Sequence, residues 1–474
     1  MRQEKAKVGL VGVGLDTYWG QFPELLPRLL SYQDGLSDRL KHMNISVINV
    51  GMIDTPQKAV DAALQLKKAD VEFVFLFIST YALSSTILPI AQQVAKPIIM
   101  LNLQPVAAID YKRVNSLGDR GKMTGEWLAH CQACSVPEFA SVFNRAGIRY
   151  DIVTGYLSDE MAWREIKSWV DAACVMYGMR NNRLGVLGHY YCGMLDVYTD
   201  LTQQSAVFGT HVELLEMCEL KAYRDAVTEI EIQAKLEEFS SEFDIEASCE
   251  IDELRRAART SVALDKIVNA HHLGSMAYYY EGFQGNDYED IVTSVIAGNT
   301  LLTGCGIPVA GECEIKNAQA MKIMSLLGAG GSFAEFYAMD FEDDVVLLGH
   351  DGPAHFAIAE EKVKLAPLPL YHGKPGKGLS IQMTVKSGDI TLLSVCEGKS
   401  GVFLLAAEGE AVQGETLHIA NTNSRYRFAS GARSFIDNWS KAGPSHHCAI
   451  GIGHKLNELK KLAFLLNIPI VVVD

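Results

Sequence analysis

Long apolar runs and an excess of positive charge are both missing from this sequence. No uninterrupted apolar stretch approaches the roughly 18 residues that span a bilayer, and residues 1–7 lead into a strand pattern instead of the apolar core of a signal peptide. The formal net charge is −15, from 42 Lys and Arg against 57 Asp and Glu. Surfaces that bind nucleic acids need clustered cations. We therefore expect a cytoplasmic protein whose partners are neither nucleic acids nor membranes.

Cysteine is sparse and the glycine signature of a dinucleotide site is lacking. The ten cysteines are scattered along the chain, which fits a reducing compartment. Cys131 and Cys134 form one Cys-x-x-Cys, but no second pair follows at the spacing of a zinc site. The glycines at 9, 12 and 14 have the order Gly-x-x-Gly-x-Gly and not Gly-x-Gly-x-x-Gly, and no predicted helix begins directly after them. Neither a disulfide scaffold nor a nicotinamide site is predicted.

The chain is long enough for about three domains of roughly 150 residues each. Apolar strand patterns, the first at 7–13, alternate with helical patterns, the first at 22–42, in the first part, and this order indicates a parallel sheet covered by helices. A second α/β pattern begins with the strand 184–187, and short strands with turn signals follow residue 330. We predict two doubly wound α/β domains, residues 1–180 and 181–329, followed by a β-rich domain, residues 330–474.

Three residues in the last third lie in contexts that suit metal ligands. Glu312 comes shortly before the helical pattern at 315–324, where the helix dipole favours a carboxylate. Glu335 follows a glycine break and lies on a predicted extended segment. His350 ends the apolar run 345–349, which is typical of a buried strand that delivers a side chain at its carboxyl end.

A pair of histidines supplies the fourth ligand type. His446 and His447 are adjacent, and in an extended segment adjacent side chains point to opposite faces, so we expect only one of them to bind an ion. Two carboxylates and two imidazoles suit a divalent cation such as Mn²⁺ and leave coordination positions open for substrate oxygens. The pattern indicates the metal site of an enzyme and not a structural zinc site.

These segments resemble L-arabinose isomerase, in the arabinose/fucose isomerase superfamily. Order and spacing agree over nearly the whole chain. The matching pieces are Ala-Gly-Glu at 310–312, Gly-Gly-Ser-Phe-Ala-Glu at 330–335, Leu-Gly-His at 348–350, the histidines at 446–447, the loop at 14–20 and the last strand at 467–474.

The resemblance implies an aldose–ketose isomerase that uses Mn²⁺ or another divalent cation. Its ligands would be Glu312, Glu335, His350 and His447, the second histidine of the pair. The resemblance also implies a homohexamer built of trimers, or a homotrimer, in which the N-terminal domain of another subunit completes the active site. An open-chain sugar would isomerise through an enediolate, with Glu312 and Glu335 as the catalytic groups, and the sequence does not fix which of the two is the base.

Further residues are candidates for contact with the sugar. Asp16, Tyr18 and Trp19 follow the first strand, and ligands of a parallel α/β sheet gather at the carboxyl ends of its strands. Packing at the sheet edge is an equal alternative for the two aromatic residues. The resemblance adds three more candidates, Met194, Tyr280 and His446.

Two departures from the family pattern bear on the substrate. Cys134 stands where the family has a histidine that reaches the sugar of the neighbouring subunit, and Leu195 replaces the arginine of a Met-Arg pair. A site built on hydrogen bonds rejects a ligand that leaves them unpaired, so L-arabinose need not be the substrate. The alternatives are another pentose, a deoxyhexose, or a non-catalytic sugar-binding protein on the same fold.

Overall fold

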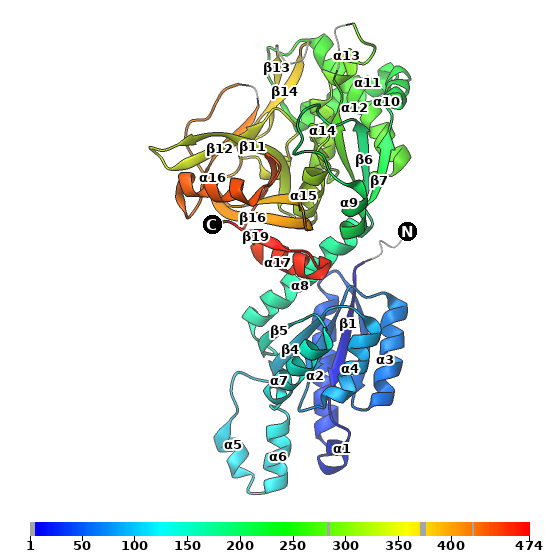
Figure 1. Ribbon diagram of the computed structural model, residues 1–474, viewed down its shortest axis with the longest axis vertical. Coiled ribbons are helices and arrows are strands. Elements are labelled where there is room, and N and C mark those ends of the chain that lie inside the picture. The colour runs from blue at the N-terminus through cyan, green and yellow to red at the C-terminus, as the bar shows by residue number, and fades with distance from the viewer. Residues whose placement is uncertain (1–4, 282–284, 370–375, 420) are drawn as a thin grey trace. The chain divides into compact units, whose positions relative to one another are not determined.

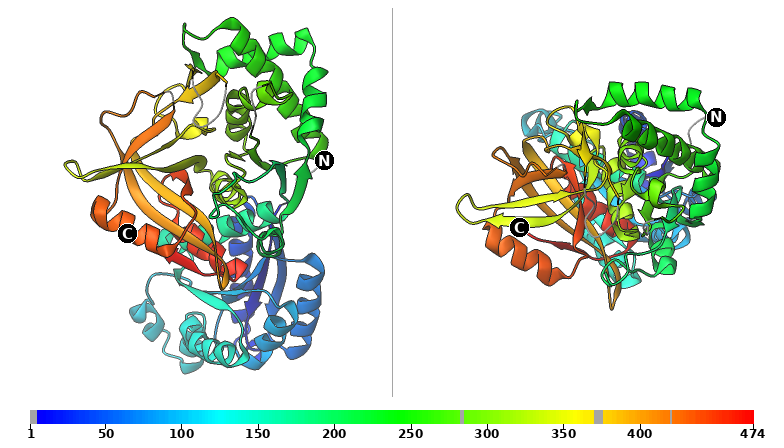
Figure 2. Two further views of the ribbon diagram at one scale, coloured as in Figure 1. Left: turned by 45° about the horizontal axis from the view of Figure 1, so that its top comes forward. Right: turned by 90° about the horizontal axis from the view of Figure 1, so that it is seen from above.

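The computed structural model describes residues 5–281, 285–369, 376–419 and 421–474. The chain divides into two compact units, Met1–Tyr177 and Gly178–Asp474 (Figures 1 and 2). Within the described residues, no helix combines the length and the apolar character needed to cross a membrane.

The first unit is built on a five-stranded parallel sheet. Its central strand has the sequence Phe-Val-Phe-Leu-Phe-Ile and is buried along its whole length, as expected for a strand with helices on both faces. In spatial order the strands are β2 (Ser46–Ile53), β1 (Lys7–Val13), β3 (Phe73–Ile78), β4 (Ile98–Gln104) and β5 (Tyr150–Tyr156).

Helices cover both faces of this sheet. Val74 and Leu76 of β3 share one apolar cluster with Ala63 and Phe139, whereas the Phe73 ring on the opposite face contacts Trp169, with the ring centroids 6.2 Å apart. The unit is therefore doubly wound, as predicted. The helices are α1 (Thr17–Gln21), α2 (Leu25–Lys41), α3 (Pro56–Ala69), α4 (Ser84–Val94), α5 (Tyr111–Ser116), α6 (Arg120–Leu128), α7 (Gln132–Ala146) and α8 (Glu160–Arg180).

The second unit begins with a four-stranded parallel sheet and its helices. In spatial order the strands are β10 (Val309–Ala310), β9 (Ser275–Tyr279), β6 (Arg183–Gly188) and β7 (His211–Leu215). The helices of this part are α9 (Leu201–Phe208), α10 (Met217–Asp225), α11 (Glu229–Glu242), α12 (Ile251–His271), α13 (Glu289–Val292) and α14 (Ile296–Gly304).

A seven-stranded sheet dominates the rest of the second unit, in the order β15-β18-β11-β12-β17-β16-β19. Because β16 also pairs with β15, the strands from β15 to β16 close on themselves as a barrel. A small sheet, β14-β13-β8, lies apart from it. The elements are β8 (Asp244–Ile245), β11 (Gly330–Asp340), β12 (Val345–His350), the 3₁₀ helix η1 (Phe356–Ile358), β13 (Lys364–Leu368), β14 (Gly378–Gln382), β15 (Gly388–Gly398), β16 (Gly401–Val412), β17 (Thr422–Arg427), α16 (Gly431–Ala442), β18 (His447–Ile452), α17 (Leu456–Leu466) and β19 (Ile470–Val472).

Helix α15 (Ile315–Leu326) connects the two sheets of the second unit, since it packs against β9 and β10 on one side and β11, β15 and β18 on the other. It is buried nearly all round, as a helix between two layers must be. The approach is close at Gly331 (φ +107°), where an added Cβ would lie 2.7 Å from the backbone oxygen of Met321. The predicted fold class is confirmed. The boundaries of the three predicted domains stay predictions.

Candidate metal centre

Three neighbouring strands bring Glu335, His350 and His447 together. Strand β11 lies between β12 and β18, and Glu335 pairs with Gly349 on one side and with His447 on the other. His350 is the next residue after Gly349 along β12. The strand register therefore places these three predicted ligands at one point of the sheet.

Glu312 reaches the same point through an unusual backbone. Glu312 and Cys313 have φ values of +52° and +56°, a left-handed conformation that non-glycine residues rarely adopt. Two hydrogen bonds hold the bend: Cys313 N donates to the Tyr278 oxygen at 3.0 Å and Glu314 N to the Gly311 oxygen at 2.9 Å. Backbone strain of this kind persists only where the surroundings enforce it, and it is concentrated at functional sites.

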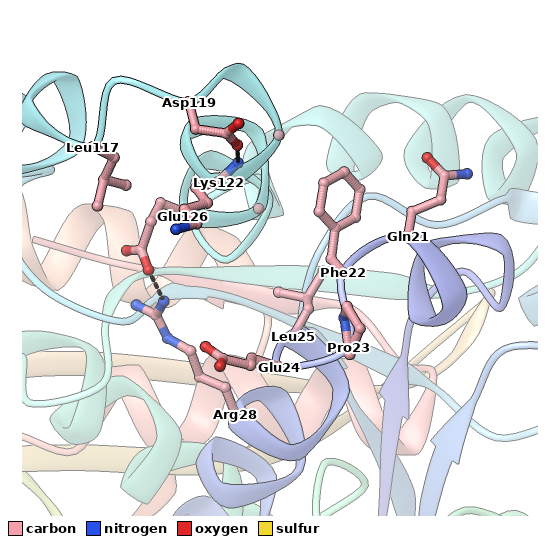
Figure 3. A pocket seen from close by; sticks show the side chains of 12 residues that line it. Gln21, Phe22, Pro23, Glu24, Leu25, Arg28, Leu117, Asp119, Lys122 and Glu126 are labelled. Carbon is pink, nitrogen blue, oxygen red and sulfur yellow. Dashed lines mark hydrogen bonds and ion pairs between the residues drawn. The ribbon is translucent and has the colours of Figure 1, made fainter.

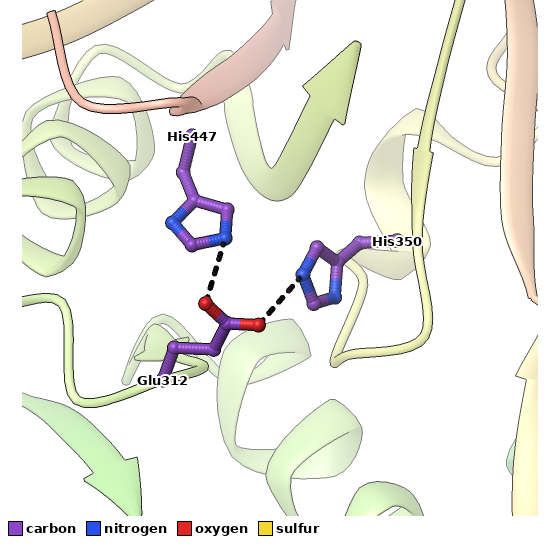
Figure 4. Close-up of side chains that lie close together, drawn as sticks. All are labelled: Glu312, His350 and His447. Atoms are coloured by element: carbon purple, nitrogen blue, oxygen red, sulfur yellow. Dashed lines mark ion pairs between the residues drawn. The ribbon is translucent and has the colours of Figure 1, made fainter. Parts of the chain in front are cut away.

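The Glu312 carboxylate lies between two imidazoles (Figure 4). Its Oε2 is 3.4 Å from Nε2 of His447, and its Oε1 is 3.9 Å from Nε2 of His350. Two groups of possible ligand atoms result, each within 4.8 Å: Glu312 with His350 and His447, and Glu335 with His446 and His447. All four predicted metal ligands thus lie in one cluster, with His447 common to both groups.

The atoms in this cluster fit a divalent cation. Oε2 of Glu312 and Nε2 of His447 are buried and have no hydrogen-bond partner among the described residues, as is also true of Nδ1 of His350. Unpaired buried polar atoms are costly, so a ligand that pairs them is favoured. Two donors that each bind one ion at about 2.1 Å lie roughly 3.0–3.5 Å apart, which the 3.4 Å separation matches. Carboxylate oxygens and imidazole nitrogens suit first-row divalent metals.

A second buried carboxylate, Glu314, orients His447. Only 1% of Glu314 is exposed, and its Oε2 lies 2.5 Å from Nδ1 of His447. With the Nδ1 proton donated to Glu314, Nε2 carries the lone pair and faces Glu312. Glu314 was not predicted as a site residue from the sequence, although it stands two positions after Glu312 at the N-cap of α15.

The expectation that His446 and His447 point to opposite faces is wrong. Their ring centroids are 3.8 Å apart, and Nε2 of His446 is 3.6 Å from Glu312 and 3.8 Å from Glu335. The reason is that β18 begins only at His447, so His446 lies in the preceding turn, where Asp196 binds its ring. The contact with Glu312, aided by Asp196, raises the pKa of His446 to about 9.

A cavity of about 620 Å³ opens onto this cluster, a size typical of small-molecule sites. Glu312, Glu335 and His350 lie in its wall, and burial raises the pKa of Glu335. Met194 lines the cavity, and its contact with a sugar stays a prediction. Tyr280 is not among the described residues that line it, whereas the following do: Tyr191, Tyr278, Tyr279, Asn299, Tyr337 and Asp351.

The three candidates in the N-terminal unit lie around α1. Asp16 precedes the helix and is exposed, whereas Tyr18 and Trp19 are half-buried and pack against an apolar cluster that includes Leu25 and Leu29. The Trp19 indole N–H donates to Asp54 at 2.8 Å. The described contacts of the two aromatic residues are therefore packing contacts within this unit.

A different cavity, of about 780 Å³, lies in the N-terminal unit between residues 21–28 and 117–126 (Figure 3). An ion pair of 3.1 Å joins Arg28 and Glu126 there. None of the predicted site residues lines it.

The two residues that depart from the family pattern, Cys134 and Leu195, are both exposed. Cys134 is exposed, and its sulfur lies 3.1 Å from that of Cys131, whose pKa burial raises to about 12. Leu195 is 73% exposed, next to Met194.

Comparison with known proteins links the second unit to one family. Residues 198–330 match the L-arabinose isomerase central domain, and residues 330–469 match the L-arabinose isomerase C-terminal domain. Similar proteins include an L-arabinose isomerase of Shewanella sp. (strain MR-7), 21% identical over 94% of this chain and 91% of the relative. Another, of Aeromonas salmonicida, is 20% identical over 85% and 80%, and one of Acidothermus cellulolyticus is 22% identical over 71% and 69%.

Proposed function

Because the chain is an L-arabinose isomerase-like protein, we propose that it converts an aldose to a ketose with the help of a divalent cation, Mn²⁺ in the first instance. The observation that supports this most directly is the pair of unpartnered buried atoms, Glu312 Oε2 and His447 Nε2, 3.4 Å apart. The ligands would be Glu312, Glu335, His350 and His447.

A bound cation would polarise the sugar carbonyl and stabilise the negative charge that develops on its oxygens. The proton transfers fall to the chain's own carboxylates. Glu312 or Glu335 removes the proton from C2 of the open-chain sugar and returns it to C1 through an enediolate, and the other assists the exchange between O1 and O2. Nε2 of His446, which lies within 4 Å of both carboxylates, would contact the reacting oxygens.

Supporting residues keep this arrangement fixed. Glu314 holds His447 in the tautomer that offers Nε2, and the β-barrel register fixes Glu335 between two strands. A sugar-binding protein without turnover would need neither the full set of carboxylates and imidazoles nor a strained backbone at Glu312. The arrangement therefore favours an enzyme.

For the substrate we propose an aldose that differs from L-arabinose at its far end, either another pentose or a deoxyhexose. The support is the loss of two polar family residues at Cys134 and Leu195. A buried hydroxyl without a partner costs roughly 1–3 kcal/mol, or about a ten- to hundredfold penalty in specificity.

We further propose a cytoplasmic homohexamer or homotrimer in which another subunit's N-terminal unit completes the site. The support is the family resemblance, together with the position of Asp16, Tyr18 and Trp19 in a different compact unit from the metal ligands.

The test is a ketose-formation assay with added Mn²⁺ over a panel of aldopentoses, aldohexoses and deoxy sugars. We expect turnover of at least one aldose, with Glu312→Gln and Glu335→Gln each losing activity by orders of magnitude, because an amide keeps the shape but cannot act as a base. Glu342→Gln, at the exposed turn between β11 and β12, is the matched control and should match wild type. Absence of turnover on the whole panel, or retained turnover in both amide variants, contradicts the proposal.

A further inference from the structure

Each histidine of the adjacent pair has a carboxylate of its own. His447 is bound by Glu314 from within α15, whereas His446 is bound by Asp196, which lies 250 positions earlier in the chain, in the loop between β6 and α9. Nδ1 of His446 donates to Oδ2 of Asp196 at 2.6 Å, and the backbone N–H of His446 donates to the same oxygen at 3.0 Å. One carboxylate oxygen therefore fixes both the ring and the main chain of His446.

Asp196 is itself held in place. Its backbone oxygen accepts a hydrogen bond from Ser445 Oγ at 3.1 Å and another from Nζ of Lys316, a lysine that is only 4% exposed on the first turn of α15. The loop, the turn before β18 and helix α15 thus meet at this one aspartate. These bonds anchor the main chain of Asp196, and its exposed carboxylate reaches His446 from that anchored position.

The direction of the imidazole follows from this contact. With Nδ1 bound to Asp196, Nε2 is the nitrogen that points at the carboxylates, 3.6 Å from Glu312 and 3.8 Å from Glu335. A ring that lost Asp196 would keep only the longer contacts of Nε2 with Glu312 and Glu335, 3.6 and 3.8 Å, so it could rotate about its side-chain bonds.

We propose that Asp196 is a positioning residue for the isomerisation, because it orients His446 so that Nε2 faces the substrate between Glu312 and Glu335. This inference rests on the proposed function. Carboxylates that orient metal-binding histidines typically contribute about 10- to 100-fold in metal affinity or activity, and we expect an effect of the same order for the carboxylate that orients His446. Asp196 acts through His446 and not through the cation, so its loss should lower kcat with little change in metal content.

The experiment is a double-mutant cycle on the Mn²⁺-loaded full-length protein, measured on whichever aldose wild type converts fastest. We expect Asp196→Ala to lower kcat about 10- to 100-fold, with Asp196→Asn less affected because its amide oxygen still accepts the Nδ1 proton. In the His446→Ala background, Asp196→Ala should change kcat less than about twofold, because the group it orients is already absent.

Two matched variants separate this role from a structural one. Ser445→Ala removes one of the two bonds to the Asp196 backbone oxygen, leaves the bond from Lys316 and does not touch the ring, and Asp200→Asn removes an equal charge four residues away, where Asp200 caps α9. Both should keep kcat within about threefold of wild type, and metal content and melting temperature should be measured for every variant.

The outcomes are distinct. A drop in kcat with Asp196→Ala that persists undiminished in the His446→Ala background overturns the inference, as does unchanged kcat with Asp196→Ala, or an equal loss with Ser445→Ala. If wild type converts no aldose, the proposed function fails and not this step. A kcat effect that vanishes without His446 supports the inference.

Discussion

Replacing Glu314 should weaken metal binding although Glu314 is not a proposed ligand. The Glu314 carboxylate is almost fully buried and accepts a 2.5 Å hydrogen bond from Nδ1 of His447. Hydrogen bonds to a charged group contribute about 1.5–3 kcal/mol, and those between neutral groups about 0.5–1.5 kcal/mol. Glu314→Gln keeps the acceptor but loses the charge, so it should cost about 1.4 kcal/mol, or about tenfold in the dissociation constant for Mn²⁺.

Glu314→Ala removes the acceptor as well and leaves a buried N–H without a partner. This adds about 1–3 kcal/mol to the loss of about 1.4 kcal/mol, so Mn²⁺ affinity should fall by about 100-fold or more. Calorimetric titration of Mn²⁺ into the metal-free protein measures both variants. The matched control is Glu213→Gln, which alters another histidine–carboxylate contact of 2.9 Å, to His271, away from the cluster. Wild-type affinity in both Glu314 variants would refute the orienting role.

Two further predictions concern histidines. His447→Ala should lower Mn²⁺ affinity by more than about 100-fold, since it removes a direct ligand, whereas His446→Ala should retain the metal. Metal analysis after dialysis measures both variants. Loss of the metal from His446→Ala but not from His447→Ala would mean that His446 is the ligand. Glu219 and Glu213 raise the pKa of His271 above its ordinary value, so the protonated ring stabilises the fold below about pH 6.5, and this contribution is lost as pH rises through the folded-state pKa. His271→Gln should therefore cost roughly 0.5–1 kcal/mol at pH 6 and less at pH 9, as thermal melts can show; an equal cost at both pH values contradicts the ion-pair interpretation.

Strands were the most predictable part of this chain. The strand predicted at 7–13 matches β1, and the apolar run at 345–349 forms β12 with His350 at its end. Both patterns are local, because a strand buried on both faces has apolar residues at nearly every position. The helix predicted at 22–42 was less accurate: the structure has α1 at Thr17–Gln21 and then α2 at Leu25–Lys41.

The residues that orient the two histidines could not be predicted in the same way. Glu314 and Asp196 lie 133 and 250 positions from the imidazoles that they bind, and an isolated acidic residue has no local signature that distinguishes it from a surface group. Their roles depend on how α15 and the loop after β6 pack against β18. That packing is a property of the folded unit and not of any short segment.

The position of Glu312, a proposed metal ligand, also could not be predicted from a short segment of the sequence. A glycine in the sequence would have indicated a left-handed bend, but Glu312 and Cys313 adopt one without it, and hydrogen bonds to Tyr278 and Gly311 help to hold the conformation. From this bend the Glu312 side chain extends toward His447, with Oε2 3.4 Å from Nε2 of the imidazole. The position of Glu312 therefore depends on β9 and α15 together, whereas the positions of Glu335, His350 and His447 follow from strand register alone.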